Sequence, residues 1–535
     1  MKKGVFRILV ALLFLFSLWL LFANLRDHAL WDDEASTAVL SRNVLKFGYP
    51  RSFDGLNYHY PISPELNWPR TYIWIGDPWI QNYIMALSFS IFGINTCTAR
   101  LLFVLMGFLT LILVYLFCVR YLKSREIGFI SAVLLATSVP FLLHMRQARY
   151  YALVTLLCFT IFYLYHRILR EKKGYLWLCL LLVLVSLTHY ATFVPMLGGV
   201  LFAALFMDRK EIKWPHFLSA CILSIFTLAS WLLFSMPAFL SDFSVYPANS
   251  SLVEIKKNFE FQVRTINGYF IPIAFWIIAV IILRFFKKHT IVKPTEEEKR
   301  IFTRLIFILL CNIAVFSIVG LRTMRYYIHY LPFLCLLEAF VLYRLFCWRK
   351  ALATVIILLI IFTNFLSRPN PLFLTKGLPA PFDFSRYSKF RTYFLDYIYE
   401  LMHEYIGPTE ALCKYLDLHA KPGDSIKILK GDLAVMFYHP ELLILNDERY
   451  FRKTYPEWIV VRKYWNPILQ QWWKGRHKIH IEDGYMDVLD RYEKILLPAV
   501  DSVRENVPDE LENHFFRNPK ITPENQMVVY RLKEK

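Results

Sequence analysis

Long apolar stretches recur along this chain and constrain its fold more than any other feature. Runs of about twenty residues, long enough to cross a bilayer core of about 30 Å as helix, extend from Val5 to Leu366. Of the 535 residues, 56% are hydrophobic and only 19% are charged, whereas a soluble domain carries about 25% charged residues. We therefore predict a mostly α-helical polytopic membrane protein.

The charges that flank these stretches predict the topology. The net charge of +19 comes from basic residues beside apolar runs, which indicates cytoplasmic loops and excludes nucleic acid as a partner. If MKKGVFR is the cytoplasmic start of a retained anchor, the basic loop VRYLKSRE must also be cytoplasmic, so Trp79–Ile94 is a juxtamembrane helix rather than a span. EEEKR at 296–300 is predicted to be a solvated loop end. The eleven predicted spans are residues 5–25, 99–122, 126–144, 150–168, 175–188, 190–207, 215–238, 269–286, 301–320, 328–347 and 351–366.

Two domains follow from this topology. Residues 1–366 form the transmembrane domain, with a long outer loop at 26–98, and residues 367–535 form an extracytoplasmic domain. The latter contains PGDSIKILKGDLAVMFYHPELLILND, whose short apolar runs between turn residues predict an α/β fold. Only Cys413 of the nine cysteines lies there, so the sequence predicts neither a disulfide framework nor a zinc site.

Three carboxylates follow the first span directly. Asp32, Asp33 and Glu34 lie in LWDDEAST, on the side predicted to be outside. Acidic residues are costly in a bilayer and contribute little to orientation, so neither insertion nor topology accounts for this cluster. A carboxylate in such a place can remove a proton from a substrate.

Two predicted outer loops are short yet basic, against the positive-inside rule. Guanidinium groups bind phosphate oxygens in bidentate fashion, and adjacent tyrosines such as Tyr150 and Tyr326 can donate further hydrogen bonds. We therefore predict an outward-facing phosphate site; the alternative is that these arginines bind lipid headgroups or pair with outer carboxylates such as Asp32. The arginines are Arg146 and Arg149 in HMRQARYY, and Arg322 and Arg325 in LRTMRYYIHY.

Three histidines are further candidates. His189, at a predicted outer turn, and His329, one turn after Arg325, either help to hold phosphate or acceptor or form hydrogen bonds between helices. His59, in the first outer loop, either stacks on a sugar ring or belongs to an aromatic belt. The chain has no P-loop, nucleotide fingerprint or GxSxG elbow, which argues against an ATP-driven pump and a serine hydrolase.

The stretch LWDDEASTAVLSRNVLKFGYP, followed by GDPWIQNYIMALSFSIFGINTCTARL, resembles the start of GT-C glycosyltransferases of the protein O-mannosyltransferase and lipid A aminoarabinose transferase type. RYYIHYLPFLCLLEAF is similar to a later signature of this superfamily. The resemblance implies a GT-C fold and the inverting transfer of a sugar from a polyprenyl-phosphate donor to an acceptor hydroxyl outside the cytoplasm. It also implies a plasma membrane location, expected to be a bacterial inner membrane, and a glycan, lipid or protein acceptor.

Carried over residue by residue, the resemblance makes Asp33 the general base and Glu34 its orienting neighbour, with Arg325 and Tyr326 near the donor phosphate. Asp32 replaces Asp33 as base if the motif is read one residue earlier.

One position departs from the pattern. Where some members have a second acidic residue, at the outer end of the fourth span, this chain has Arg149 and Tyr150, and Asp77 is the proposed substitute. No cofactor is firmly implied, although a divalent metal held between Asp33 and Asp77 is left open by their oxygen ligands.

Two other functions are compatible with a phosphate site in a membrane protein. A flippase for a lipid-linked saccharide would also present arginines to phosphate, but transporters place such groups near the midplane between two similar halves. A non-catalytic subunit could have the fold without the chemistry.

Overall fold

The computed structural model describes residues 3–59, 71–238, 240, 251–285, 294–367, 392–428, 430–446, 455–462, 486–501, 506–509, 511, 514, 521–523 and 525–533. By their contacts, the residues divide into two units. The first unit is Met1–Ala23 with Phe103–Met402, and the second is Asn24–Leu102 with His403–Lys535. The outer loop predicted at 26–98 therefore groups with the C-terminal part of the chain rather than with the apolar helices.

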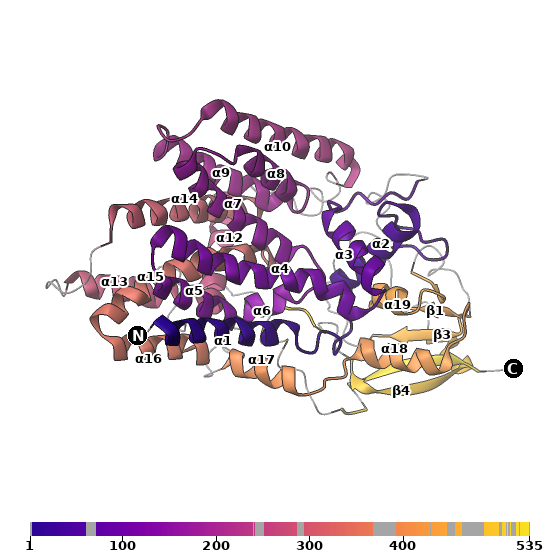
Figure 1. Cartoon of the computed structure of the whole chain (residues 1–535). Helices are drawn as coiled ribbons and strands as arrows, with labels where there is room; N and C mark the ends of the chain where they lie inside the picture. The colour runs from indigo at the N-terminus through magenta and orange to yellow at the C-terminus, as the bar shows by residue number, and fades with distance from the viewer. Residues whose placement is uncertain are drawn as a thin grey trace. The chain divides into compact units, whose positions relative to one another are not determined.

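Apolar helices build the first unit (Figure 1). They are α1 (Lys3–Phe22), α4 (Thr96–Phe117) with the π-helical turn η2 (Cys118–Leu122), α5 (Arg125–Thr137), α6 (Val139–Met145), α7 (Tyr151–Glu171), α8 (Tyr175–Ser186), α9 (Tyr190–Phe206), α10 (Trp214–Phe234), α12 (Leu252–Thr265), η3 (Ile266–Phe270), α13 (Ile273–Phe285), α14 (Glu296–Val319), η4 (Met324–Tyr330), α15 (Leu331–Trp348), α16 (Lys350–Phe362), η5 (Phe365–Ser367) and α17 (Tyr393–Met402).

Each of the eleven predicted spans coincides with one of these helices or with a pair of them. Among the described residues, six helices are long and apolar enough to cross a membrane, or seven if the bent pair α5 and α6 counts as one span. That pair bends by 68° at Ser138, which is extended and is followed by Pro140 at the start of α6. The helical membrane fold is thus confirmed, and the count of eleven spans stays a prediction.

Close helix contacts hold the first unit together. Helix α9 packs on α14, α10 on α8, and α15 on α5. Gly199 of α9 permits the first of these contacts, because a Cβ atom there would lie 2.6 Å from the Cα atom of Ile308. Small residues commonly allow such approach where membrane helices pack.

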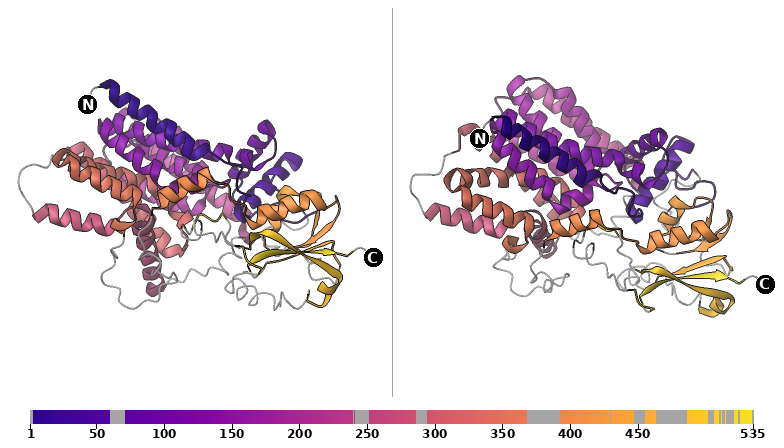
Figure 2. Two further views of the ribbon diagram at one scale, coloured as in Figure 1. Left: turned by 90° about the horizontal axis from the view of Figure 1, so that it is seen from below. Right: turned by 60° about the horizontal axis from the view of Figure 1, so that its bottom comes forward.

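The second unit combines two helices of the outer loop with a mixed sheet. The sheet order is β2-β1-β3-β5-β4, in which β1 lies parallel to β2 and β3, and β5 lies antiparallel to β3 and β4. Figure 2 shows the long antiparallel ribbon of β4 and β5. The predicted α/β fold of the C-terminal part is therefore confirmed. The elements are α2 (Asp32–Phe47), α3 (Ile80–Phe92), α18 (Pro408–His419), β1 (Ser425–Lys427), α19 (Asp432–Tyr438), β2 (Leu443–Ile444), β3 (Trp458–Val461), η8 (Met486–Arg491), β4 (Tyr492–Val500) and β5 (Gln526–Leu532).

Candidate active site

The three carboxylates of LWDDEAST form the first turn of α2. Negative charge at a helix N-terminus interacts favourably with the helix dipole, so the acidic cluster is also a helix start signal. The helix ends at Gly48, whose φ of 82° lies in the left-handed region that glycine adopts without strain. The sequence thus places Asp32, Asp33 and Glu34 on consecutive positions of one helical turn, where their side chains point in different directions.

Glu34 is buried and held by an arginine that follows the outer loop. The Nε and Nη2 atoms of Arg100 donate to its two carboxylate oxygens at 2.8 and 2.7 Å. Arg100 also donates to the carbonyl oxygens of Leu25 and His28, at 2.9 and 3.0 Å. A buried bidentate pair with its remaining donors satisfied fixes α2 against the segment that precedes it. Glu34 therefore orients the turn that carries Asp33 through Arg100.

The two aspartates of this turn have different surroundings. The carboxylate of Asp32 forms an ion pair with the ammonium group of Lys430, from the loop after β1. Asp33 is partly buried, and its backbone oxygen accepts a hydrogen bond from the Thr37 hydroxyl at 3.1 Å. Asp77 is also partly buried, in the turn before α3. All four predicted carboxylates thus belong to the second unit.

His59 lies against α2 in the same unit. Its ring is fully buried, its Nε2 atom is 2.9 Å from the Ser36 hydroxyl, and it meets the Trp74 ring edge-on with centroids 4.7 Å apart. Stacking on a sugar would need an accessible ring face, so in this structure His59 packs the outer loop onto α2 instead.

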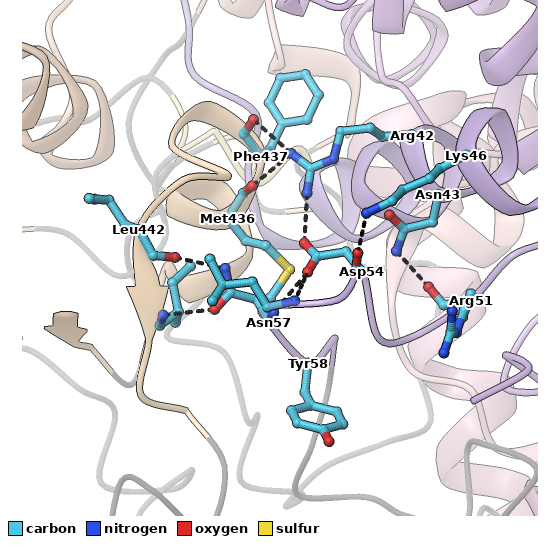
Figure 3. A network of polar contacts seen from close by, with 12 residues as sticks. Arg42, Asn43, Lys46, Arg51, Asp54, Asn57, Tyr58, Met436, Phe437 and Leu442 are labelled. Carbon is cyan, nitrogen blue, oxygen red and sulfur yellow. Dashed lines mark hydrogen bonds and ion pairs between the residues drawn. The ribbon is translucent and has the colours of Figure 1, made fainter. Parts of the chain in front are cut away.

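Polar contacts join the outer loop to the C-terminal part within the second unit (Figure 3). Arg42 of α2 donates to Asp54 at 3.2 Å and to the Met436 carbonyl at 3.0 Å. The Asn57 amide pairs with the Leu442 carbonyl and the Ile444 backbone N–H, both at 2.8 Å. The loop that carries the carboxylates is therefore anchored to α19 and to edge strand β2.

In the first unit, five of the predicted residues gather into a stacked cluster. The His189 ring lies parallel to Tyr150 and to Tyr326, with centroid distances of 4.6 and 5.8 Å and an interplanar angle of 15° for each pair. Arg149 lies over the Tyr150 ring at 5.5 Å, and Arg325 lies over the Tyr326 ring at 5.6 Å. We call these five residues the stacked cluster; they come from the turn before α7, the turn before α9, and η4.

The electrostatics of the stacked cluster agree with this geometry. Burial, and then the charge of Arg149, lower the pKa of His189 to about 3, so its imidazole is neutral at physiological pH. Its Nδ1 atom is 2.7 Å from the Thr192 hydroxyl in the first turn of α9. The cluster therefore combines two permanent cations with neutral polar rings.

The other two predicted arginines have contacts elsewhere. Arg146 donates to the carbonyls of Leu20 and Leu21 at 3.1 and 3.2 Å, which caps the last turn of α1. Arg322 pairs with Glu254 of α12. Both arginines thus link helices.

His329 is buried, with its Nε2 atom 2.8 Å from the Asn312 side-chain oxygen on α14. This contact is the interhelical alternative that the sequence left open.

An ion-pair network lies at helix ends that the topology predicts to be cytoplasmic. Asp208, whose side chain is fully buried, accepts two hydrogen bonds from Arg304 at 2.8 and 2.7 Å and one from the Tyr165 hydroxyl at 2.9 Å. Burial opposes its ionisation, but these bonds and Arg300 outweigh that effect, so the pKa of Asp208 is lowered. We call these four residues the ion-pair network.

The predicted solvated loop end EEEKR is in fact the first turn of α14. Glu298 forms a capping box with Thr295 and pairs with Arg344 at 2.7 Å. The expectation of a loop was wrong because Thr295 and Glu298 have the spacing of a capping box.

Sequence reasoning missed Arg100 and Lys430 as residues of this region. Arg100 carried a signal, since a charge inside an apolar run calls for a partner. The sequence around Lys430 gave no such signal, because its contact with Asp32 joins distant parts of the chain. Among the described residues, no three His, Cys, Asp or Glu side chains are arranged to hold a metal ion.

Known proteins resemble the chain in sequence and in fold. Residues 77–234 match the family described as dolichyl-phosphate-mannose-protein mannosyltransferase. An uncharacterised protein of Aquifex aeolicus (strain VF5) is 27% identical over 290 residues, which are 51% of this chain and 53% of that protein. The match thus spans about half the length of that relative.

Among solved structures, ArnT from Cupriavidus metallidurans bound to undecaprenyl phosphate has a TM-score of 0.53 at 13% identity, over 83% of this chain and 86% of ArnT. The oligosaccharyltransferase of Archaeoglobus fulgidus, tethered with an acceptor peptide, has a TM-score of 0.44 at 12% identity, over 84% of this chain and 64% of that one. The predicted resemblance is thereby confirmed: the chain has the fold of the GT-C superfamily of membrane glycosyltransferases.

Proposed function

We propose that the protein transfers a sugar from a polyprenyl-phosphate donor to an acceptor hydroxyl at the extracytoplasmic face of a plasma membrane, with inversion at the anomeric carbon. Asp33 removes the acceptor proton, and the stacked cluster binds the donor phosphate. The acceptor hydroxyl attacks the anomeric carbon while the bond from that carbon to the phosphate oxygen breaks, so the lipid leaves as polyprenyl phosphate.

The observation that carries this proposal is the gathering of Arg149 and Arg325 around Tyr150, His189 and Tyr326. Two guanidinium groups that lie on aromatic rings suit a phosphate. Each ring contacts the face of the guanidinium group, whereas phosphate oxygens bind along the guanidinium edge. The same groups would stabilise charge that grows on the leaving phosphate. The fold of ArnT, solved with undecaprenyl phosphate bound, supports a lipid-phosphate donor.

The ion-pair network supports an enzyme over a flippase. A flippase must open its binding site to both sides in turn. Here the helix ends predicted to be cytoplasmic are joined by Asp208 and Arg304, whose buried pair is costly to separate. A flippase would have to separate this pair in each cycle, whereas a transferase would not.

A transfer assay tests the proposal. The purified full chain in nanodiscs is given a panel of polyprenyl-phosphate sugars with lipid, glycan and peptide acceptors, and mass spectrometry identifies the product. We expect a sugar-modified acceptor and free polyprenyl phosphate. Sugar-lipid that crosses the bilayer without any product would overturn the proposal. A parallel reaction with EDTA decides whether a divalent metal between Asp33 and Asp77 contributes.

Replacement of the base should have a large effect on the rate of transfer. Asp33→Asn removes the proton acceptor at constant size, and we expect transfer to fall by about 10²-fold or more while donor affinity stays near the wild-type value. Asp27→Asn, the same change in the same outer segment, serves as the matched control and should leave the rate within about twofold, as surface changes usually do. Undiminished transfer by Asp33→Asn excludes Asp33 as the base.

A further inference from the structure

The C-terminal part of the chain contacts the segment that leads into the first turn of α2, which we call the acidic turn. The Tyr438 hydroxyl accepts a hydrogen bond from the Leu30 backbone N–H at 3.0 Å, and the Asn506 amide donates to the Ala29 carbonyl at 2.9 Å. Two residues later, Lys430 pairs with Asp32. Three side chains from separate elements of the C-terminal part thus hold residues 29–32.

Lys430 lies at the edge of the sheet where α/β folds place their functional groups. It follows β1, and Arg462 and Asn446 follow the neighbouring parallel strands β3 and β2. The carboxyl ends of parallel strands are the usual location of ligand contacts in open sheets. Here that edge faces the start of α2.

The other charged groups around Lys430 are matched within the C-terminal part. Arg462 pairs with buried Asp501 at 2.6 Å and donates to the Lys430 carbonyl at 3.2 Å. Asp432 accepts from the Asn446 amide at 2.7 Å. The Lys430 ammonium is the group that reaches the acidic turn, where it forms its ion pair with Asp32.

We propose that Lys430 is a positioning residue for the transfer reaction: its ion pair with Asp32 sets the orientation of the acidic turn and compensates the second carboxylate, so that Asp33 acts as the base. This inference rests on the proposed function. Two adjacent carboxylates disfavour each other's ionised form, and a cation on one of them removes that repulsion. The C-terminal part then supplies a positioning residue, and the choice between Asp32 and Asp33 follows from which of them Lys430 holds.

Protonation of Lys430 is compatible with this role. Burial lowers the pKa of Lys430 to about 8, while Asp432 acts in the opposite direction and Arg462 adds to the lowering. At pH 7, Lys430 is therefore protonated in most molecules, and its ammonium group can pair with a carboxylate.

The test compares Lys430→Met, Lys430→Arg, Asp32→Asn and the double variant Asp32→Asn with Lys430→Met in the transfer assay. We expect Lys430→Met to lower kcat by about tenfold, because the turn that carries Asp33 loses the contact that orients it, with donor KM changed less than about twofold. Lys430→Arg should restore most of kcat, because it keeps the positive charge. Since the two residues act through one contact, the double variant should be no slower than Lys430→Met alone.

Lys414→Met is the matched control, because Lys414 pairs with Glu410 on α18 of the same unit. It should leave kcat unchanged. Wild-type kcat in Lys430→Met, or additive losses in the double variant, would overturn the inference.

Folding and function can be separated. Melting temperature and gel filtration report whether each variant folds, and Lys430→Gln provides a second neutral side chain. If both neutral variants fail to fold while Asp32→Asn folds, Lys430 supports the fold independently of Asp32 and the inference is overturned. If the wild-type chain transfers no sugar from any donor, the proposed function fails; if it does and Lys430→Met matches it, only this inference fails.

Discussion

The stacked cluster and the ion-pair network both gather arginines at helix ends of the first unit, yet their contacts differ. In the network, Arg304 binds both oxygens of buried Asp208. In the cluster, Arg149 and Arg325 lie over tyrosine rings that stack on a neutral histidine. A bidentate carboxylate pair uses the edge of the guanidinium group and serves the fold, whereas a ring contact uses its face, and phosphate recognition uses the edge.

This contrast refines what the positive-inside rule can indicate. The rule identified four arginines on the disfavoured side, and only their contacts separate Arg149 and Arg325 from Arg146 and Arg322. A charge on the wrong side of a membrane therefore indicates that some contact requires it, and the contact itself decides between fold and ligand.

The largest effect is expected at the ion-pair network. Arg304→Leu would leave the carboxylate of Asp208 buried without its bidentate partner, a change that costs about 3–5 kcal/mol. We expect little monodisperse protein and a much lower melting temperature. Arg300→Ala, which removes a more exposed partner of the same aspartate, should cost less than about 1 kcal/mol. An Arg304→Leu protein as stable as the wild type would show that the ion-pair network does not stabilise the fold.

Next in size is the effect at the stacked cluster. Arg325→Ala should leave folding intact and weaken binding of undecaprenyl phosphate by about 10- to 100-fold, since a hydrogen bond to a charged group contributes roughly 1.5–3 kcal/mol. Arg322→Ala is the control, because Arg322 lies three residues earlier in the chain and pairs with Glu254. It should change affinity by less than about threefold. Isothermal titration in nanodiscs measures both. Equal affinity in the two variants would remove Arg325 from the phosphate site.

The helices were predictable because hydropathy is a local property of the sequence. All eleven predicted spans coincide with helices, and the α/β character of the C-terminal part followed from its short apolar runs. The bend at Ser138 was not predicted, although Pro140 lies inside the predicted span 126–144, where a proline kinks a helix.

The candidate site was only partly predictable. Local sequence gave the acidic turn and the anomalous arginines, but not which arginine of each loop joins the cluster, because that depends on how each helix is rotated against its neighbours. Lys430 could not be found from sequence at all, since KGD reads as an ordinary turn. Contacts between distant segments have no local signature.

A smaller effect should separate stacking from hydrogen bonding at His189. His189→Phe keeps a ring between Tyr150 and Tyr326 and loses the contact with Thr192, whereas His189→Gln keeps a hydrogen-bonding group and loses the ring. If stacking organises the cluster, His189→Gln should weaken donor binding about three- to tenfold, the equivalent of 0.5–1.5 kcal/mol for an aromatic pair, and His189→Phe should bind nearly as wild type. The reverse order would assign the role to the hydrogen bond.

A final effect concerns pH and tests whether the His189 ring is neutral. Because its pKa in the folded protein is about 3, against about 6.5 when unfolded, the unfolded chain binds a proton below pH 6.5 that the folded chain does not. The His189 contribution therefore makes stability fall as pH falls through that window, by about 2 kcal/mol at pH 5. His189→Phe lacks this proton, so its melting temperature should fall less than that of the wild type between pH 7 and pH 5. A steeper fall in the variant would mean that His189 is charged in the folded protein, and the stacked cluster would then hold a third cation instead of a neutral ring.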